Sequence, residues 1–84
     1  MRNSIIDKTI RSGYTYIFTF TIINSEIYGN TKVYGIGIAG DGREEFIDDI
    51  SPDKNMVENL YHLICQEVLF PEHLKDVVED CLAG

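Results

Sequence analysis

The sequence has few cysteines, few basic residues and no long apolar run, and each shortage argues against a class of protein. It holds two cysteines among 84 residues, whereas a disulfide-stabilised secreted domain of this size usually carries about four or more. The longest apolar stretch, residues 14–23, is interrupted by threonines and is well short of the roughly 20 residues of a membrane-spanning helix. The first four residues carry one charged side chain and no apolar run of signal-peptide length. We therefore expect a cytoplasmic protein with reduced cysteines.

Basic residues are scarce and unevenly placed. The chain has 7 basic and 14 acidic residues and a net charge of −7. Residues 41–84 hold twelve acidic and three basic side chains, a balance of −9, whereas residues 1–40 hold two acidic and four basic ones, a balance of +2. Direct nucleic-acid binding is disfavoured, because it depends on cationic contacts to phosphates. The same distribution predicts a strongly negative side that selects basic partners.

The composition is that of a small globular domain. Hydrophobic residues make up 44% and charged residues 25% of the chain, as in ordinary folded proteins. No internal repeat, linker or low-complexity segment divides the sequence. We expect residues 1–84 to form a single domain, since this length supports one small core.

Four segments are predicted to be strands, at about residues 5–11, 14–23, 31–39 and 43–50. In the second, aromatic and apolar residues alternate with threonines, which predicts one core face and one wetter face. The core-facing row of this segment is Tyr14, Tyr16, Phe18, Phe20 and Ile22. Ser12-Gly13 and Gly40-Asp41-Gly42 are typical of hairpin turns, and residues 24–30 are expected to form a loop. Gly35 and Gly37 remove side chains from one face of the third strand, so that the aromatic row or a helix can fill the space.

Two helices are predicted, at about residues 52–69 and 71–82. Ser51 is expected to be the N-cap, with Pro52 at the first helical position and Asp53 in the first turn. The first helix should end before Pro71, which also suits the start of the second. Apolar residues at helical spacing are Val57, Leu60, Tyr61, Ile64 and Val68 in the first helix, and Leu74, Val77, Val78, Cys81 and Leu82 in the second. Both cysteines, Cys65 and Cys81, are expected to be buried within these helices.

Strands followed by helices indicate an α+β fold. We expect a four-stranded antiparallel β-meander followed by two C-terminal helices packed on one sheet face, which leaves the other face solvated.

Motifs that resemble catalytic or cofactor sites lack the context that such chemistry needs. Residues 35–40 match the glycine fingerprint of dinucleotide-binding domains, but they lie within a strand and lead into a turn rather than a helix. His62, Cys65 and His73 offer three candidate zinc ligands where a structural site ordinarily has four, and a Cys–His nucleophile pair lacks an orienting group. We therefore predict no catalytic residue, no metal site and no cofactor, and expect that the protein is not an enzyme.

Acidic side chains are the remaining candidates for function. The second helix carries an acidic stripe opposite its apolar face, which is either a solvated surface or a docking surface for a basic partner. The doublets Glu44-Glu45 and Asp48-Asp49 cannot each converge on one atom, because neighbouring strand residues face opposite ways. The predicted partner-binding residues are Glu44, Glu45, Asp48, Asp49, Glu72, Asp76, Glu79 and Asp80.

The favoured hypothesis is a non-catalytic acidic protein-interaction module. In its sharpest form it is an inhibitor that mimics nucleic acid and binds a basic nucleic-acid-handling protein, as anti-CRISPR-like phage-encoded inhibitors of similar size and charge do. One alternative is a small-ligand-binding or sensor domain that uses the aromatic sheet face, including Tyr34. Another is a self-associating protein, in which Ile27, Tyr28 and an exposed sheet edge pair two copies as a homodimer.

Cap and core positions in the second half of the chain form a further pattern. It comprises Asp49-Ile50-Ser51, Asp53, the Val57/Leu60 helix, Pro71-x-His73-Leu74 and residues 76–80, with Tyr34-Gly35-Ile36 upstream. Over residues 45–82 the chain resembles an uncharacterised family of small clostridial and related Firmicute proteins. The resemblance implies a small cytosolic fold and carries no assigned activity.

Overall fold

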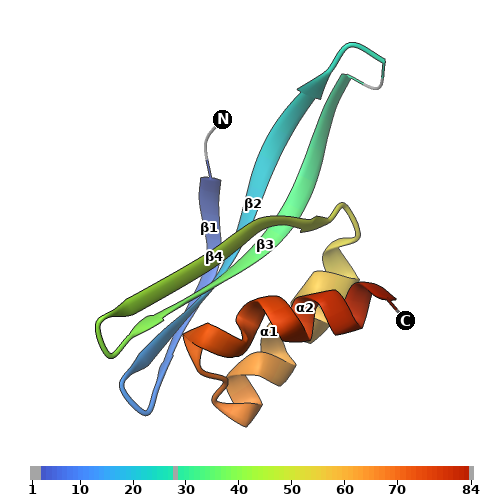
Figure 1. Cartoon of the computed structure of the whole chain (residues 1–84). Coiled ribbons are helices and arrows are strands. Elements are labelled where there is room, and N and C mark those ends of the chain that lie inside the picture. Colours follow the sequence, from blue (N-terminus) through green and yellow to red (C-terminus); the bar gives the residue numbers. More distant parts are fainter. Residues whose placement is uncertain (1–2, 28, 84) are drawn as a thin grey trace.

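The computed structural model describes residues 3–27 and 29–83 and shows an open antiparallel sheet followed by helices (Figure 1). The strands are β1 (Asn3–Arg11), β2 (Tyr14–Ser25), β3 (Gly29–Gly40) and β4 (Arg43–Ser51), and they lie in that order across the sheet. After β4 come α1 (Lys54–Glu67), a short 3-10 helix η1 (Pro71–His73) and α2 (Leu74–Ala83). The predicted α+β fold, a β-meander with two C-terminal helices, is confirmed.

Tight turns join β1 to β2 and β3 to β4. Both central residues of each turn have positive φ, at 53° and 82° for Ser12-Gly13 and at 54° and 74° for Asp41-Gly42, as type I′ hairpin turns require. The loop expected over residues 24–30 is shorter than predicted, because residues 24 and 25 pair with residues 30 and 29. β2 and β3 therefore continue as a two-stranded ribbon beyond β1 and β4 (Figure 1). Tyr28, expected to help pair two copies, lies outside the described residues.

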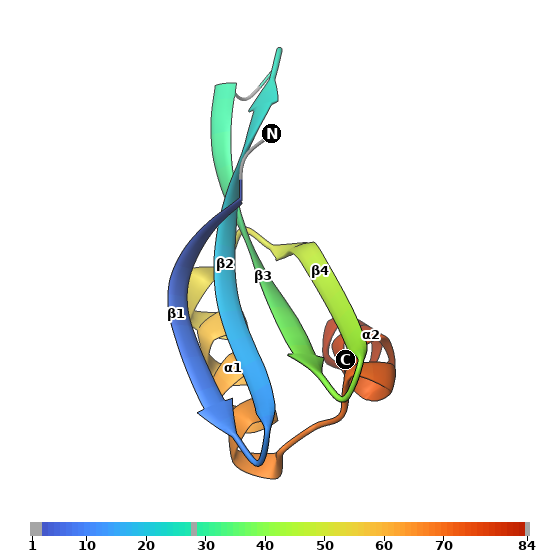
Figure 2. The same ribbon diagram turned by 90° about the vertical axis from the view of Figure 1, so that its left-hand side faces the viewer.

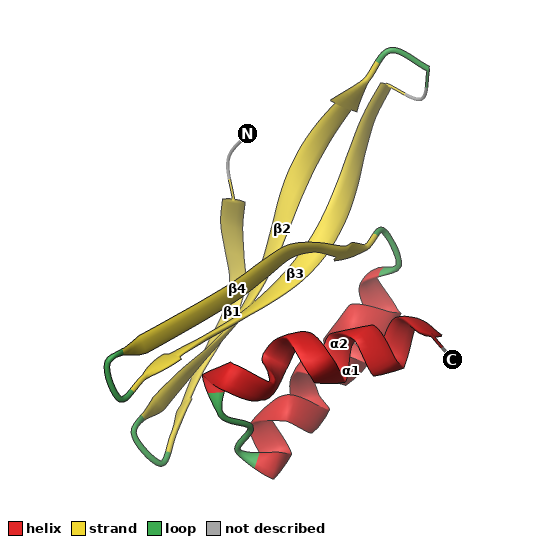
Figure 3. Cartoon of the chain, in the orientation of Figure 1, coloured by secondary structure: helices red, strands yellow, loops and turns green. Residues whose placement is uncertain are grey.

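The core lies between one face of the sheet and the helices, which occupy the same side (Figure 3). Its buried members are Tyr16, Phe18, Ile36, Ile38 and Ile50 from the sheet, Val57, Leu60, Tyr61, Ile64 and Cys65 from α1, and Leu74 and Val78 from α2. Tyr16 and Phe18 are at most 1% exposed. Tyr14, Tyr16, Phe18 and Tyr34 of the aromatic row considered as a pocket wall thus belong to the core or pack against it. The core-facing row predicted in the second strand does not hold at its far end, where Phe20 is outside the core cluster and Ile22 is 45% exposed.

The limits of α1 differ from those predicted. Its N-cap is Asp53, whose carboxylate accepts a hydrogen bond from the Met56 N–H at 3.2 Å. Ser51 is still paired within β4, so it cannot cap the helix and instead accepts a hydrogen bond from the Asp53 N–H. At the other end Val68 adopts the left-handed conformation, at φ 51°. The N–H of Leu69 donates to the Ile64 carbonyl, as in a Schellman motif, and the helix closes at Glu67, two residues earlier than expected.

The second helical segment packs only in part. Leu74 and Val78 are buried and Val77 is partly buried against the core. Cys81 is exposed and Leu82 is 53% exposed, so the prediction of a buried Cys81 is wrong. The last turn of α2 is therefore exposed, whereas Leu74 at its beginning is buried. Neither α1 nor α2 has the length and apolarity to cross a membrane.

Candidate functional site

β4 forms one edge of the sheet and carries four acidic residues, and neighbouring acidic residues along it face opposite ways. α2 and η1 both pack against β4, and Figure 2 shows α2 beside that strand. We call the resulting surface the acidic edge. Its members are the exposed residues Glu44, Glu45, Asp49, Glu72, Asp76, Glu79 and Asp80. Residues up to 36 positions apart in the sequence therefore lie on elements that pack against one another.

The acidic edge is little neutralised by basic groups. Within the described part of the chain its one ion pair joins Arg43 Nη1 to Glu72 Oε2 at 2.9 Å. Both side chains are well exposed, at 65% and 45%, and exposed pairs of this kind contribute about 0–1 kcal/mol to stability. The other carboxylates are left to repel one another and to attract cationic groups.

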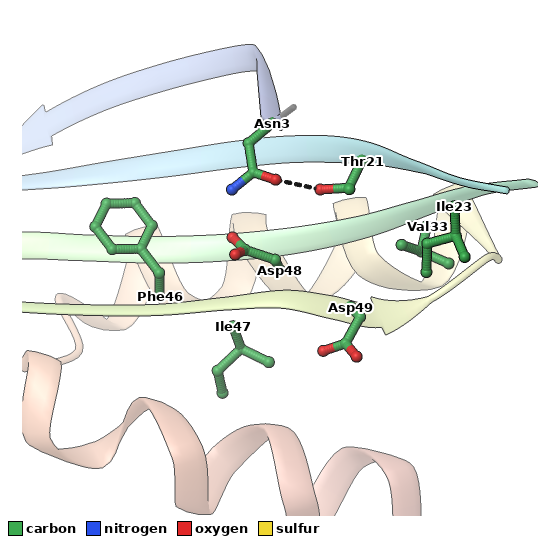
Figure 4. A pocket seen from close by; sticks show the side chains of 8 residues that line it. All are labelled: Asn3, Thr21, Ile23, Val33, Phe46, Ile47, Asp48 and Asp49. Atoms are coloured by element: carbon green, nitrogen blue, oxygen red, sulfur yellow. Dashed lines mark hydrogen bonds between the residues drawn. The ribbon is translucent and has the colours of Figure 1, made fainter. Parts of the chain in front are cut away.

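Asp48, predicted as part of the same surface, lies elsewhere. Tyr34 pairs with Ser51, and Ile36 pairs with Ile47. A step of two residues along β3 therefore corresponds to a step of four residues along β4, which forms a bulge. This bulge lets both Ile47 and Ile50 pack on the core. Asp48 is half-buried and turns to the face of the sheet that has no helices (Figure 4).

Asp48 lines a groove on that helix-free face, which was not predicted from the sequence. The groove has a volume of about 380 Å³. We call it the open-face groove. Its lining residues are Asn3, Thr21, Ile23, Val33, Phe46, Ile47, Asp48 and Asp49. In Figure 4, Phe46 and Asp48 point to the same side of the sheet as Asn3 and Thr21, while Ile47 points the opposite way toward the helices.

The polar groups beside the groove are more buried than the sequence suggested. Thr19 and Thr21, expected on a wetter face, are each 3% exposed. Thr21 donates its hydroxyl hydrogen to Asn3 Oδ1. Among the described residues, Thr19 Oγ1 and Asp48 Oδ1 are buried and have no hydrogen-bond partner. Buried polar atoms of native proteins are rarely left unpartnered, so this region has unused hydrogen-bonding capacity.

The two glycines of β3 explain how β4 approaches this face. A Cβ at Gly37 would collide with the Phe46 ring, and one at Gly35 would collide with the backbone of Ile47 and Asp48. The space beside the glycines is therefore filled by β4 itself, not by the aromatic row or a helix as expected. Alternate glycines on the threonine-bearing face were the signal in the sequence that pointed to this side of the sheet.

The candidate zinc ligands His62, Cys65 and His73 differ in burial and position. His62 and His73 are exposed on separate elements, whereas Cys65 is buried in α1. Burial raises the pKa of the Cys65 thiol, which disfavours the reactive thiolate at neutral pH. In residues 3–27 and 29–83 no group of three or more His, Cys, Asp or Glu side chains is placed to hold a metal ion.

Fold and surface together define a small α+β domain with an open sheet, one helix-covered face and an acidic edge. The chain belongs to a family of unknown function, DUF6514, whose model matches residues 3–84. The match includes β1 and β2, so it extends beyond the 45–82 segment on which the resemblance to an uncharacterised family was based. Comparison with curated proteins and with solved structures gives no match.

Proposed function

We propose that the protein is a non-catalytic interaction module that binds a basic protein through the acidic edge. One observation carries the proposal: the edge strand β4, together with η1 and α2 that pack against it, carries seven exposed acidic residues, and only Glu72 among them is paired within the described part of the chain. Such a surface steers a cationic partner toward it and repels acidic ones. The repulsion that it causes within the folded chain is unfavourable, which supports a role beyond solubility.

The finer form of the proposal concerns the partner, an intracellular protein that handles nucleic acid. Its phosphate-binding lysine and arginine side chains are complementary to a row of carboxylates. In this form the module occupies the partner's nucleic-acid site and acts as an inhibitor. The support is the size and charge of the domain, by analogy with other acidic inhibitors.

Charge-matched variants test the proposal. The first variant, Asp76→Asn/Glu79→Gln/Asp80→Asn, neutralises α2, and the control, Asp7→Asn/Glu26→Gln/Glu67→Gln, removes three exposed acids outside the acidic edge. Both changes shift the net charge from −7 to −4. Immobilised wild type and control should retain the same basic protein from a host lysate at low salt, and the α2 variant should not.

Two further results decide between the forms of the proposal. Retained protein should elute as salt screens the charges, and equal loss in both variants would show that net charge alone is responsible. For a purified partner, a nucleic acid that it binds should compete with the domain. Simultaneous binding of both would contradict the mimicry and leave the interaction module standing.

A further inference from the structure

We infer that the open-face groove is a binding site for an organic cation, an ammonium or guanidinium group on an apolar stem. The groove lies on the helix-free face and shares only Asp49 with the acidic edge. The inference is carried by a groove of about 380 Å³ that Asp48 lines. Asp48 is half-buried, and no hydrogen-bond donor among the described residues reaches its buried Oδ1.

The charge of the site selects the ligand. A carboxylate oxygen removed from water is unfavourable unless a donor or a cation compensates it. Asp48 Oδ1 receives no such compensation from the described residues, and Asp49 lines the same groove. Anionic ligands are therefore repelled, and a cation with N–H donors supplies what Asp48 lacks.

A second buried oxygen without a partner in the described part of the chain, Thr19 Oγ1, belongs to the same face of the sheet, although Thr19 is not among the residues that line the groove. Thr19 pairs with Gly35 on β3, and the other side of Gly35 lies against the backbone of Asp48. Thr19 and Asp48 thus flank a residue without a side chain on the same sheet face, and Thr19 is 3% exposed. Ammonium and guanidinium groups both carry several N–H donors, so one cationic head can donate to the Asp48 carboxylate and to Thr21, which also lines the groove.

The apolar residues that line the groove are suited to contact the alkyl chain of such a ligand. The Phe46 ring lies across Gly37, and its side chain is partly exposed, which leaves an aromatic face for a cation–π contact. Ile23 and Val33 line the groove together with Asp48 and Phe46. The volume is that of a site for a small molecule or one long side chain. A short alkyl chain with a cationic head combines these requirements.

The probes for the test are n-butylguanidinium and n-butylammonium, with n-butanol as the neutral analogue. In an NMR titration of the full chain, both cations should produce saturable shifts at Thr19, Thr21 and Phe46, and butanol should not. Asp48→Asn should weaken cation binding about tenfold or more, a loss equivalent to about 1.4 kcal/mol. Asp80→Asn, the same charge change on α2, should alter the affinity less than about twofold, since exposed and distant charges are screened.

Phe46→Leu provides a second variant that does not alter the charge. It removes the aromatic face and should weaken both cations several-fold. Shifts that do not saturate, equal shifts with butanol, or equal losses in Asp48→Asn and Asp80→Asn would overturn the inference. If Asp48→Asn fails to fold, the Phe46→Leu result and the butanol control decide the question.

The two sources of the cation are distinguished with a capped Gly-Arg-Gly peptide. Tighter binding of the peptide than of n-butylguanidinium assigns the groove to an arginine side chain of a partner protein. Tighter binding of the free alkyl cation assigns it to a small amine or guanidine. Failure of all three cations rejects the groove as a site, while the α2 variant still tests the acidic edge separately.

Discussion

At the scale of single residues, Tyr61 connects α1 to two strands. Its hydroxyl donates to the Tyr16 carbonyl at 3.2 Å and contacts Thr9 Oγ1 at 2.8 Å. Its ring stacks on Phe18 with centroids 5.5 Å apart. A polar tip that is satisfied within an apolar layer holds the helix in one position on the sheet.

Removing the Tyr61 hydroxyl should therefore destabilise the fold. Tyr61→Phe leaves the Tyr16 carbonyl and Thr9 without this partner and should lower the free energy of unfolding by about 1–3 kcal/mol. Urea unfolding followed by circular dichroism measures the change. Tyr34→Phe is the control, because the Tyr34 hydroxyl makes no hydrogen bond to the rest of the described chain, and it should be close to neutral. Equal losses in the two variants would contradict the role given to Tyr61.

Alkaline pH should unfold the protein through its buried hydroxyl and thiol groups. Burial raises the pKa of Tyr61 and Tyr16 above the ordinary value of 10.0, and that of Cys65 above 9.0. The folded state thus favours their neutral forms, whereas the unfolded chain ionises first. Stability should be constant with respect to these groups below about pH 8 and fall steadily above about pH 9. Urea titrations across that range should show a weaker fall for Tyr61→Phe, and an equal fall would contradict the assignment to Tyr61.

At the scale of elements, β3 and β4 are joined more closely than a pair of ordinary strands. Gly35 faces the backbone of the β4 bulge, whereas Gly37 faces the side chain of Phe46. Both glycines remove a side chain from the same face of β3, but one lies against backbone and the other against a side chain. The two sites should therefore differ in how much stability an added methyl group costs.

Alanine at the two glycines should have unequal effects. Gly35→Ala forces its methyl group against the β4 backbone, which cannot move without breaking the pairing, and should cost about 1–3 kcal/mol. At Gly37 the Phe46 ring can rotate aside, and alanine also restricts the unfolded chain, so Gly37→Ala should cost less than about 1 kcal/mol. Thermal melting compares them, and a larger loss at Gly37 would contradict the register of β4.

Periodicity in the sequence was enough to predict the number, order and type of the elements. Alternation in residues 14–23 and helical spacing in residues 57–68 both reflect which side chains meet the core. The bulge of β4 could not be predicted in this way, because it depends on Ile47 and Ile50 both finding space against the core. The left-handed conformation of Val68 was also missed, since Pro71, three residues beyond the C-cap, marks only an upper limit for the end of the helix.

The predictions for the candidate site were limited because the site depends on contacts between elements that are separate in the sequence. The acidic residues were identified from the sequence, but their grouping depends on α2 packing beside β4. Thr19 and Thr21 were assigned to a wetter face, and their burial depends on groups from other strands, among them Asn3 against Thr21 and Phe46 across Gly37. A groove lined by residues from four strands has no signature in any one of them.

At the scale of the whole molecule, the uneven charge should have a cost in stability. Asp76 lies four residues from both Glu72 and Asp80 on one helical segment, and like charges at this spacing are destabilising by about 0.2–0.5 kcal/mol per pair. Glu79 and Asp80 near the C-terminus of α2 also oppose the helix dipole, whereas Asp76 in the first turn is favourably placed.

Neutralising α2 should therefore stabilise the domain at low salt. We expect the Asp76→Asn/Glu79→Gln/Asp80→Asn variant to melt at a higher temperature than wild type and to respond less to added salt, which screens the repulsion. Differential scanning calorimetry at low and high salt gives both quantities. A variant that is less stable than wild type at low salt would show that these acids support the fold.

The measurement that tests the account most directly is the affinity of the captured basic partner for the two charge-matched variants. The account predicts that the α2 variant loses about tenfold or more in Kd at low salt, that the control stays close to wild type, and that raising the salt removes the difference. Equal affinities of the two variants, or binding that salt does not weaken, would contradict a function carried by the acidic edge.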